Sequence, residues 1–224
     1  MKRSNGIFYL SVSCLLLCGC GDSSDQVDYV ALGASDAVGI GAVAPFKGYV
    51  FEIEVRLDDN QNCKGADLKN LGILGAKAGD IQNASLPIAK ELDPDLITLF
   101  TGGNDIISGD SVEEFESQLE KILRELANET QAQVFVANLP NLTLLTRFTE
   151  NPDPDVTLSR VQAFNAAIAR QAAAHGASVV DLFTNLAFAE SLVSDDGFHP
   201  SQEGHRSIAR LFLAQIEPRI CTGN

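Results

Sequence analysis

Five short runs rich in apolar residues constrain the fold of this chain more than any other feature of its sequence. They lie at residues 30–32, 68–73, 95–100, 133–137 and 178–182. Apolar runs without strict alternation are typical of strands buried on both faces, as in a parallel sheet. Because parallel strands need a long crossover between them, usually a helix, we predict an α/β fold: a three-layer α/β/α sandwich on a five-stranded parallel sheet.

The segments between these runs carry helical signals. Ser111 and Glu114 form a capping box ahead of apolar residues spaced three and four apart, which predicts a helix. Similar spacing predicts a helix through residues 158–176 and a last helix through residues 208–216, capped by Ser201.

One segment, residues 49–58, is ambiguous. Apolar and charged residues alternate from Phe51 to Leu57, as in a strand, whereas Tyr49, Ile53 and Leu57 also lie on one helical face. We expect a helix here, because the alternating β–α order requires a crossover at this point.

The first residues have the features of an export signal. Lys2 and Arg3 precede an apolar run at residues 7–17. That run has 11 residues, whereas a helix that spans a bilayer needs about 20. The run ends in Leu17-Cys18-Gly19-Cys20, which resembles the lipobox of bacterial lipoproteins.

The lipobox resemblance implies that residues 1–19 are a lipoprotein signal peptide and that Cys20 is lipidated. Residues 20–27 would then form a polar tether, and residues 28–224 one folded domain. The implied location is the bacterial cell envelope, lipid-anchored on the periplasmic face or the cell surface. The alternative is an ordinary cleaved signal with an incidental cysteine.

The charge of the chain limits its partners. The formal net charge is −14, and it becomes −16 without residues 1–19, which hold two basic and no acidic residues. Such a surface disfavours nucleic acid, so we expect no nucleic-acid partner. We expect membrane contact through the lipid anchor only; the sequence does not indicate an oligomeric state.

The cysteine count predicts a disulfide. Cys14 and Cys18 would leave with the signal and Cys20 would be acylated, so only Cys63 and Cys221 remain in the folded part. An even pair in an exported protein is typical of a disulfide, the alternative being two free thiols.

Four short motifs supply the candidate functional residues, and the first three fall at or just after predicted strands. They are Gly33-Ala34-Ser35-Asp36, Asn70-Leu71-Gly72-Ile73-Leu74-Gly75, Gly102-Gly103-Asn104-Asp105 and Asp196-Gly197-Phe198-His199-Pro200. In open α/β sheets, ligands bind beyond the carboxyl ends of the strands. We therefore expect the motifs to meet at that edge.

Ser35 is a candidate nucleophile at a strand-to-helix turn, although Gly-Ala-Ser-Asp alone could equally be a turn that caps a helix. A phosphate-binding loop is excluded, because Gly39-Ile40-Gly41 is not followed by the Lys-Ser/Thr of a P-loop and lacks the third glycine of a dinucleotide fingerprint.

Asp196 and His199 form a candidate acid–histidine pair. An acid three residues before a histidine can fold back on its Nδ1, which leaves Nε2 free to take a proton from a serine. The alternatives are a plain surface loop, or Asp195 as the acid. We expect His205 to be structural and His175 to be a cation at a helix C-terminus.

Gly75 and Asn104 are candidate oxyanion donors, together with the N–H of Ser35. A backbone N–H at Gly75 and the side-chain amide of Asn104 could each bind a developing negative charge. Taken singly, each of these two residues is also a common turn residue.

The four motifs together resemble those of the SGNH, or GDSL-type, hydrolases. The signature residues of that family fall on Ser35, Gly75, Asn104 and His199, with Asp196 as the acid. The resemblance implies a flavodoxin-like sandwich and hydrolysis of carboxylic esters without a metal or a cofactor. Ala34 stands in place of the aspartate of Gly-Asp-Ser, and Asp36 stands where leucine is common.

The expected activity is a serine ester hydrolase, a GDSL-type esterase or lipase that cleaves acyl esters or lysophospholipids through an acyl-enzyme. The expected partner is thus a small-molecule ester. One alternative is a carbohydrate O-deacetylase, and another is a non-enzymatic envelope lipoprotein that binds a ligand. We expect residues 140–145 and 151–155 to wall the pocket.

Overall fold

The computed structural model describes residues 26–44, 47–186 and 190–221. The predicted signal peptide, Cys20 and most of the predicted tether lie outside these residues. Among the described residues, no helix is both long enough and apolar enough to cross a membrane.

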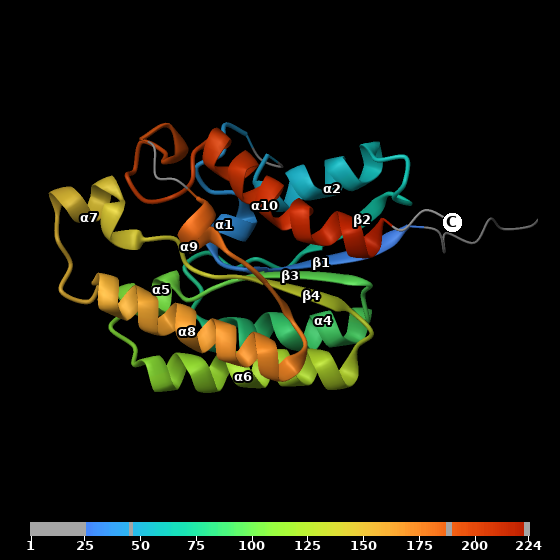
Figure 1. Ribbon diagram of the computed structural model, residues 1–224, viewed down its shortest axis with the longest axis horizontal. Helices are drawn as coiled ribbons and strands as arrows, with labels where there is room; N and C mark the ends of the chain where they lie inside the picture. The colour runs from blue at the N-terminus through green and yellow to red at the C-terminus, as the bar shows by residue number, and fades with distance from the viewer. Residues whose placement is uncertain (1–25, 45–46, 187–189, 222–224) are drawn as a thin grey trace, which may run out of the picture.

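A five-stranded sheet forms the centre of the molecule, with the strand order β2-β1-β3-β4-β5 (Figure 1). All four strand pairs are parallel, which confirms the predicted fold class. The strands are β1 (Val27–Gly33), β2 (Ala66–Asn70), β3 (Leu96–Phe100), β4 (Gln133–Ala137) and β5 (Ser178–Val180).

Helices cover both faces of the sheet, as a parallel sheet requires. One face carries α1 (Ser35–Val38), α2 (Tyr49–Asp59) and α10 (Gln202–Ile220), and the other carries α4 (Leu86–Leu92), α6 (Val112–Glu129) and α8 (Leu158–His175) (Figure 1). Shorter helices connect these layers: α3 (Ala78–Asp80), η1 (Ile81–Ser85), α5 (Gly103–Ile107), η2 (Leu142–Leu144), α7 (Thr146–Glu150), α9 (Leu182–Asn185) and η3 (Glu190–Leu192).

The core lies between the sheet and the two helix layers. β3 is buried along its whole length, and β1 is buried from Tyr29 onward. The Tyr29 hydroxyl is hydrogen-bonded to Thr98 Oγ1 at 2.8 Å, so the buried polar groups of these central strands satisfy each other. Each fully buried large apolar side chain contributes about 1.5–3 kcal/mol to stability.

The ambiguous segment forms the helix α2. Its buried side chains are Tyr49, Val50, Ile53 and Leu57, whereas Val55 is 52% exposed. The helical spacing therefore decides the structure, and the alternation along the segment does not produce a strand.

The boundaries of β1 and β2 differ most from the prediction. Val27, placed at the end of the predicted tether, is the first residue of β1, where its N–H bonds Gly65 O at 3.0 Å. β2 begins at Ala66 and ends at Asn70 rather than running through residues 68–73. The regular strand ends there because Asn70 Oδ1 accepts from Gly72 N at 3.0 Å and turns the backbone. Leu71 N and Ile73 N still donate to carbonyls of β1, at 2.9 and 3.0 Å.

The helix ends follow the predicted caps. Ser111 Oγ accepts from Glu114 N at 3.1 Å, and Ser201 Oγ accepts from Gly204 N at 3.2 Å. Gly176 closes α8 in the left-handed region, at φ 72°, which favours glycine.

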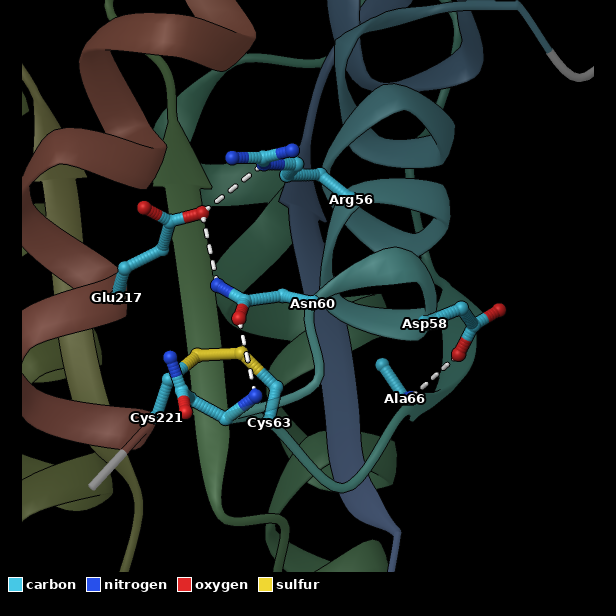
Figure 2. The surroundings of a disulfide bond; sticks show 8 residues. Arg56, Asp58, Asn60, Cys63, Ala66, Glu217 and Cys221 are labelled. Atoms are coloured by element: carbon cyan, nitrogen blue, oxygen red, sulfur yellow. Dashed lines mark hydrogen bonds and ion pairs between the residues drawn. A yellow bond between two sulfur atoms is a disulfide. The ribbon is translucent and has the colours of Figure 1, made fainter. Parts of the chain in front are cut away.

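A disulfide joins Cys63, in the loop after α2, to Cys221 at the end of α10 (Figure 2). Around it, Asp58 Oδ1 accepts from Ala66 N at 2.9 Å, and Glu217 receives hydrogen bonds from Arg56 and Asn60. This cluster lies at the edge of the sheet where the strands begin, and the site described next lies at the other edge.

Candidate active site

Ser35 is the first residue of α1, directly beyond β1, and is only 7% exposed. The turn that places it needs a glycine at position 33, because a Cβ there would lie 2.8 Å from Phe100 O on the neighbouring strand. Close packing of β1 against β3 therefore brings Ser35 to the carboxyl edge of the sheet.

His199 reaches Ser35 from the far end of the sequence. Its Nε2 lies 2.9 Å from Ser35 Oγ, and its Nδ1 lies 2.6 Å from Asp196 Oδ2. An ionised carboxylate only accepts hydrogen bonds, so we assign the ring proton to Nδ1, which leaves Nε2 to accept from the serine hydroxyl. The structure thus joins Ser35, His199 and Asp196 in one chain of hydrogen bonds.

Asp196 is held as an anion. Burial raises the pKa of its carboxyl, but four hydrogen bonds outweigh burial and lower that pKa below the ordinary value. Those bonds come from His199 Nδ1, from Ser194 Oγ at 2.8 Å, and from the N–H groups of Phe198 and His199 at 2.8 and 2.9 Å. The described contacts of His199 involve Asp196 and not the alternative acid, Asp195.

Helix α7 supports the loop that carries this pair. Gly197, at φ 70°, accepts from Arg147 N at 3.0 Å, and a Cβ at Gly197 would lie 2.9 Å from that nitrogen. Phe198 contacts Phe148 edge-on at 5.9 Å between ring centres and contacts the His199 ring at 4.8 Å. These contacts fix the orientation of the imidazole.

The two other predicted donors lie in neighbouring loops. Asn104, on α5, donates from Nδ2 to Ala76 O at 3.0 Å, and its second amide hydrogen stays available. Gly75 has φ 70° and is exposed. Ser35, Ala76 and Asn104 line one cavity; Gly75 precedes Ala76 at its border.

Asp105 holds these loops together. It is fully buried, and its carboxylate accepts from Ala78 N at 3.1 Å, so it ties α5 to the turn that follows Gly75. Burial raises the pKa of Asp105 to about 6, although the Ala78 N–H opposes the shift. No role was predicted for this residue, whose only signal in the sequence was its place next to Asn104.

The cavity beside Ser35 is small and mostly apolar. Its volume is about 60 Å³. Its apolar wall includes Phe100, Leu139, Leu142, Leu145, Phe198 and Ile208. Of the two segments expected to wall it, residues 140–145 do so.

Comparison with known proteins identifies the family. The sequence profile of the GDSL-like Lipase/Acylhydrolase family matches residues 31–207. The chain belongs to this family. It is therefore a carboxylic ester hydrolase. No curated protein sequence matches the chain.

Solved structures share the fold of this GDSL-like hydrolase. TesA has a TM-score of 0.70 at 19% identity, over 85% of this chain and 98% of its own. A lipase/acylhydrolase from Enterococcus faecalis has a TM-score of 0.70 at 20% identity, over 89% of this chain and 100% of its own. The acetylxylan esterase Axe2 from Geobacillus stearothermophilus has a TM-score of 0.69 at 18% identity, over 85% and 94%.

One expected wall of the hydrolase lies elsewhere. Residues 151–155 are not among the described residues that line the cavity. Asp155 lies instead 3.8 Å from Arg160 Nη1 and packs against Gly109, so this segment covers the α5–α6 connection.

Asp36 adds a carboxyl group to the cavity wall. It lies next to Ser35, and its carboxyl interacts with its own backbone N–H and with the nearby His199 and His205. Burial raises the pKa of this carboxyl, while the nearby His199 and His205 oppose the shift.

The other two histidines lie outside the chain of hydrogen bonds. His205 is fully buried, and both of its ring nitrogens hydrogen-bond to backbone atoms, in agreement with the structural role expected for it. His175 is the last residue of α8, and its Nε2 lies 3.9 Å from Glu120 Oε1. Among the described residues, no group of three or more potential ligands could hold a metal ion.

Proposed function

We propose that Ser35, His199 and Asp196 are the catalytic residues of this ester hydrolase and that the reaction passes through an acyl-enzyme. One observation carries the proposal: Ser35 Oγ lies 2.9 Å from His199 Nε2 while Nδ1 of the same ring lies 2.6 Å from Asp196. That is the geometry of a nucleophile, its base and the group that orients the base.

The reaction then follows from these contacts. Ser35 Oγ attacks the ester carbonyl and its proton passes to His199 Nε2, while Asp196 stabilises the imidazolium. The N–H groups of Ser35 and Gly75 and the amide of Asn104 bind the oxyanion. The imidazolium gives its proton to the leaving alcohol, and a water, deprotonated by His199, releases the acid from Ser35.

Replacement of the nucleophile tests the proposal. Ser35→Ala should lower kcat on a short p-nitrophenyl ester by about 10³-fold or more, since the base then has no hydroxyl to activate. The melting temperature should stay near that of the wild type. A variant with near-normal turnover would refute the assignment.

A covalent probe separates the enzyme from a ligand-binding lipoprotein. A fluorophosphonate should label the wild type at Ser35, as read by mass spectrometry of the labelled peptide, and should not label Ser35→Ala. Absence of labelling in the wild type would favour the binding protein.

The expected substrates are acyl esters or lysophospholipids, but the cavity favours a second candidate, an O-deacetylase that acts on carbohydrate. Since one water needs about 10–15 Å³ of such space, a cavity of about 60 Å³ holds a short acyl group better than a long chain. The fold neighbour Axe2 is an acetylxylan esterase. A kcat/KM optimum at acetate among C2–C12 esters would support deacetylation, and an optimum at C8 or longer would exclude it.

We also propose export and lipidation at Cys20, which would place the enzyme in the bacterial envelope. The Cys63–Cys221 disulfide supports export, because structural disulfides form in oxidising compartments. Palmitate labelling and membrane fractionation test the anchor. The wild type should be labelled and pellet with membranes, and Cys20→Ala should do neither.

The direction of β1 bears on which substrates an anchored enzyme would reach. β1 starts at Val27, seven residues after Cys20, and runs toward Ser35. Seven extended residues reach at most about 25 Å, which is about the rise of the strand between Val27 and Ser35. Only a fully extended tether would therefore bring the site back to the anchoring membrane, which favours esters in the aqueous compartment over lipids of that membrane.

A further inference from the structure

The proposed nucleophile and base must be held in register across a long stretch of chain. Ser35 and His199 are 164 residues apart, and their hydrogen bond joins α1 to the loop before α10. Helix α1 has only four residues, and the segment after it contains Gly39 and Gly41, both at positive φ. The Ser35 side of the site therefore depends on contacts from outside α1.

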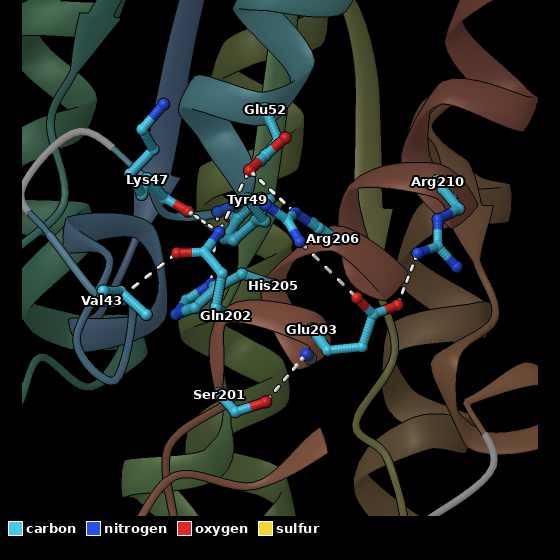
Figure 3. A network of polar contacts seen from close by, with 11 residues as sticks. Val43, Lys47, Tyr49, Glu52, Ser201, Gln202, Glu203, His205, Arg206 and Arg210 are labelled. Atoms are coloured by element: carbon cyan, nitrogen blue, oxygen red, sulfur yellow. Dashed lines mark hydrogen bonds and ion pairs between the residues drawn. The ribbon is translucent and has the colours of Figure 1, made fainter. Parts of the chain in front are cut away.

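His205 supplies two such contacts from the first turn of α10, and Figure 3 shows its ring beside Tyr49. Tyr49 N donates to its Nδ1 at 3.2 Å, and its Nε2 donates to Ile40 O at 2.9 Å. Both ring nitrogens are thus used, and the ring is fully buried, so water does not replace either bond.

Gln202 lies one turn earlier on α10 and binds the same segment. Its Oε1 accepts from Val43 N at 3.2 Å, and its Nε2 donates to Lys47 O at 3.0 Å and to Glu52 Oε1 at 3.1 Å. Residues three apart on a helix share one face, and Figure 3 shows both side chains directed at the segment between α1 and α2. Three of its backbone groups, and the N–H of Tyr49 at the start of α2, are therefore bound to two side chains of α10.

These contacts connect directly to both reacting groups. Ile40, which accepts from His205, donates its own N–H to Ser35 O at 3.0 Å. On the other side, α10 begins three residues after His199. A Cβ at Gly41 would collide with the backbone of Pro200 and approach His199 Cβ to 3.2 Å, so the two segments touch without intervening side chains.

We propose that His205 is a positioning residue of the hydrolase, with Gln202 as a second contact, and that the His205–Ile40 bond holds Ser35 at hydrogen-bonding distance from His199. This inference rests on the proposed catalytic roles of Ser35 and His199. A displacement of about 1 Å between reacting groups can lower turnover about 100-fold, so the bond acts on kcat more than on KM.

The protonation of His205 agrees with this arrangement. Burial lowers the pKa of its imidazole, and His199 lowers it further, while the Ile40 carbonyl, Asp36 on α1 and Glu52 on α2 oppose the shift. The neutral ring, with its proton on Nε2, is the form that can accept from Tyr49 and donate to Ile40 at once.

Three replacements of His205 separate the two bonds. His205→Gln places an amide near the position of Nε2 and can keep the bond to Ile40. His205→Asn reaches only the position of Nδ1 and can keep the bond to Tyr49, and His205→Ala removes both. We expect kcat on a p-nitrophenyl ester to fall 10–100-fold in the alanine and asparagine variants, with KM within threefold, and to recover to within about fivefold of the wild type in the glutamine variant.

Gln202→Ala keeps the inference testable if the buried His205 variants do not fold, because Gln202 is only half-buried. We expect its kcat to fall about 3–10-fold, with the rate of fluorophosphonate labelling at Ser35 falling in parallel. Gln215→Ala is the matched control: it removes the same side chain, also half-buried, from the far half of α10, and kcat should stay within twofold.

Two outcomes would overturn the inference while leaving the proposed function intact. One is a wild type that is labelled at Ser35 together with folded His205 and Gln202 variants that are labelled at the same rate. The other is equal recovery by asparagine and glutamine at position 205, which would indicate general packing. A wild type that neither turns over esters nor reacts with the probe would refute the proposed function itself.

Discussion

At the carboxyl edge of the sheet, loops after three strands and the loop before α10 bring reactive side chains together. At the amino edge, by contrast, a disulfide and paired polar groups join the end of α10 to the loop after α2. The first edge holds the Ser35–His199–Asp196 chain and the buried Asp105, whose pKa is raised to about 6. The second holds Cys63–Cys221.

The two edges differ in whether their polar groups have hydrogen-bond partners and in whether they leave room for a ligand. Around the disulfide, Ala66 N, Asn62 N and Glu217 all have partners within the chain. Beside Ser35, burial raises the pKa of the Asp36 carboxyl, to which no other described side chain hydrogen-bonds, and the cavity has room for a ligand. This contrast indicates that turnover depends on the carboxyl edge and that the disulfide at the amino edge contributes to stability. A variant at the amino edge should therefore leave turnover unchanged, and a variant at the carboxyl edge should leave the contribution of the disulfide unchanged.

The largest expected effect is at Asp196. Asp196→Asn should lower kcat on p-nitrophenyl acetate about 10³–10⁴-fold, because an amide does not hold the Nδ1–H tautomer or stabilise the imidazolium. The neighbouring replacement, Asp195→Asn, is the control and should stay within twofold of the wild type. Equal losses in both variants would remove the distinction between the two acids.

The disulfide should show the reverse pattern. The double variant Cys63→Ser/Cys221→Ser should lose about 2–5 kcal/mol of unfolding free energy in urea titrations, since the bond closes most of the chain into a loop. Its kcat at 25 °C should match that of the wild type. If the folded variant lost turnover, the two edges would not be independent.

Asp105 should make stability depend on pH. Its folded pKa is raised to about 6 from 3.8, so its favourable contribution is complete below about pH 4 and is lost as pH rises through 6. The amide of Asp105→Asn does not ionise, so the variant does not lose this stability as pH rises. The unfolding free energy of the variant should therefore rise relative to the wild type by about 2.4 kcal/mol between pH 4 and pH 7, measured by urea titration at each pH; a constant difference would contradict the pKa.

The smallest expected effect is on selectivity at Asp36. In its ionised form, the Asp36 carboxyl on the cavity wall attracts cationic substrates. The kcat/KM ratio of acetylcholine to its neutral isostere 3,3-dimethylbutyl acetate should fall about tenfold in Asp36→Asn and in Asp36→Leu. An unchanged ratio in both variants would show that the charge does not act on the substrate.

Much of the fold was predictable because its signals are local. The helical stripe of α2, the serine caps of α6 and α10, and the glycine that ends α8 each depend on a few neighbouring residues. The end of β2 was predicted wrongly, because the Asn70 side chain turns the backbone there, and apolar content does not report such a bond.

The candidate site was predictable in part. The motif residues lie where strand ends meet, and the structure places Ser35, Asn104 and His199 there. The roles of Asp105, Gln202 and His205 depend on bonds to backbone atoms of distant segments. Such bonds have no signature in residue type, which is also why the contact of Asp155 with the α5–α6 connection was not predicted.

The sequence by itself determined the layered α/β fold and the kinds of reactive group available, because periodicity and motif spacing are properties of neighbouring residues. Only the tertiary structure decided that Ser35 and His199 meet at 2.9 Å and that the cavity beside them measures about 60 Å³. Both depend on how the sheet packs against α10, and close packing is set jointly by side chains far apart in the chain.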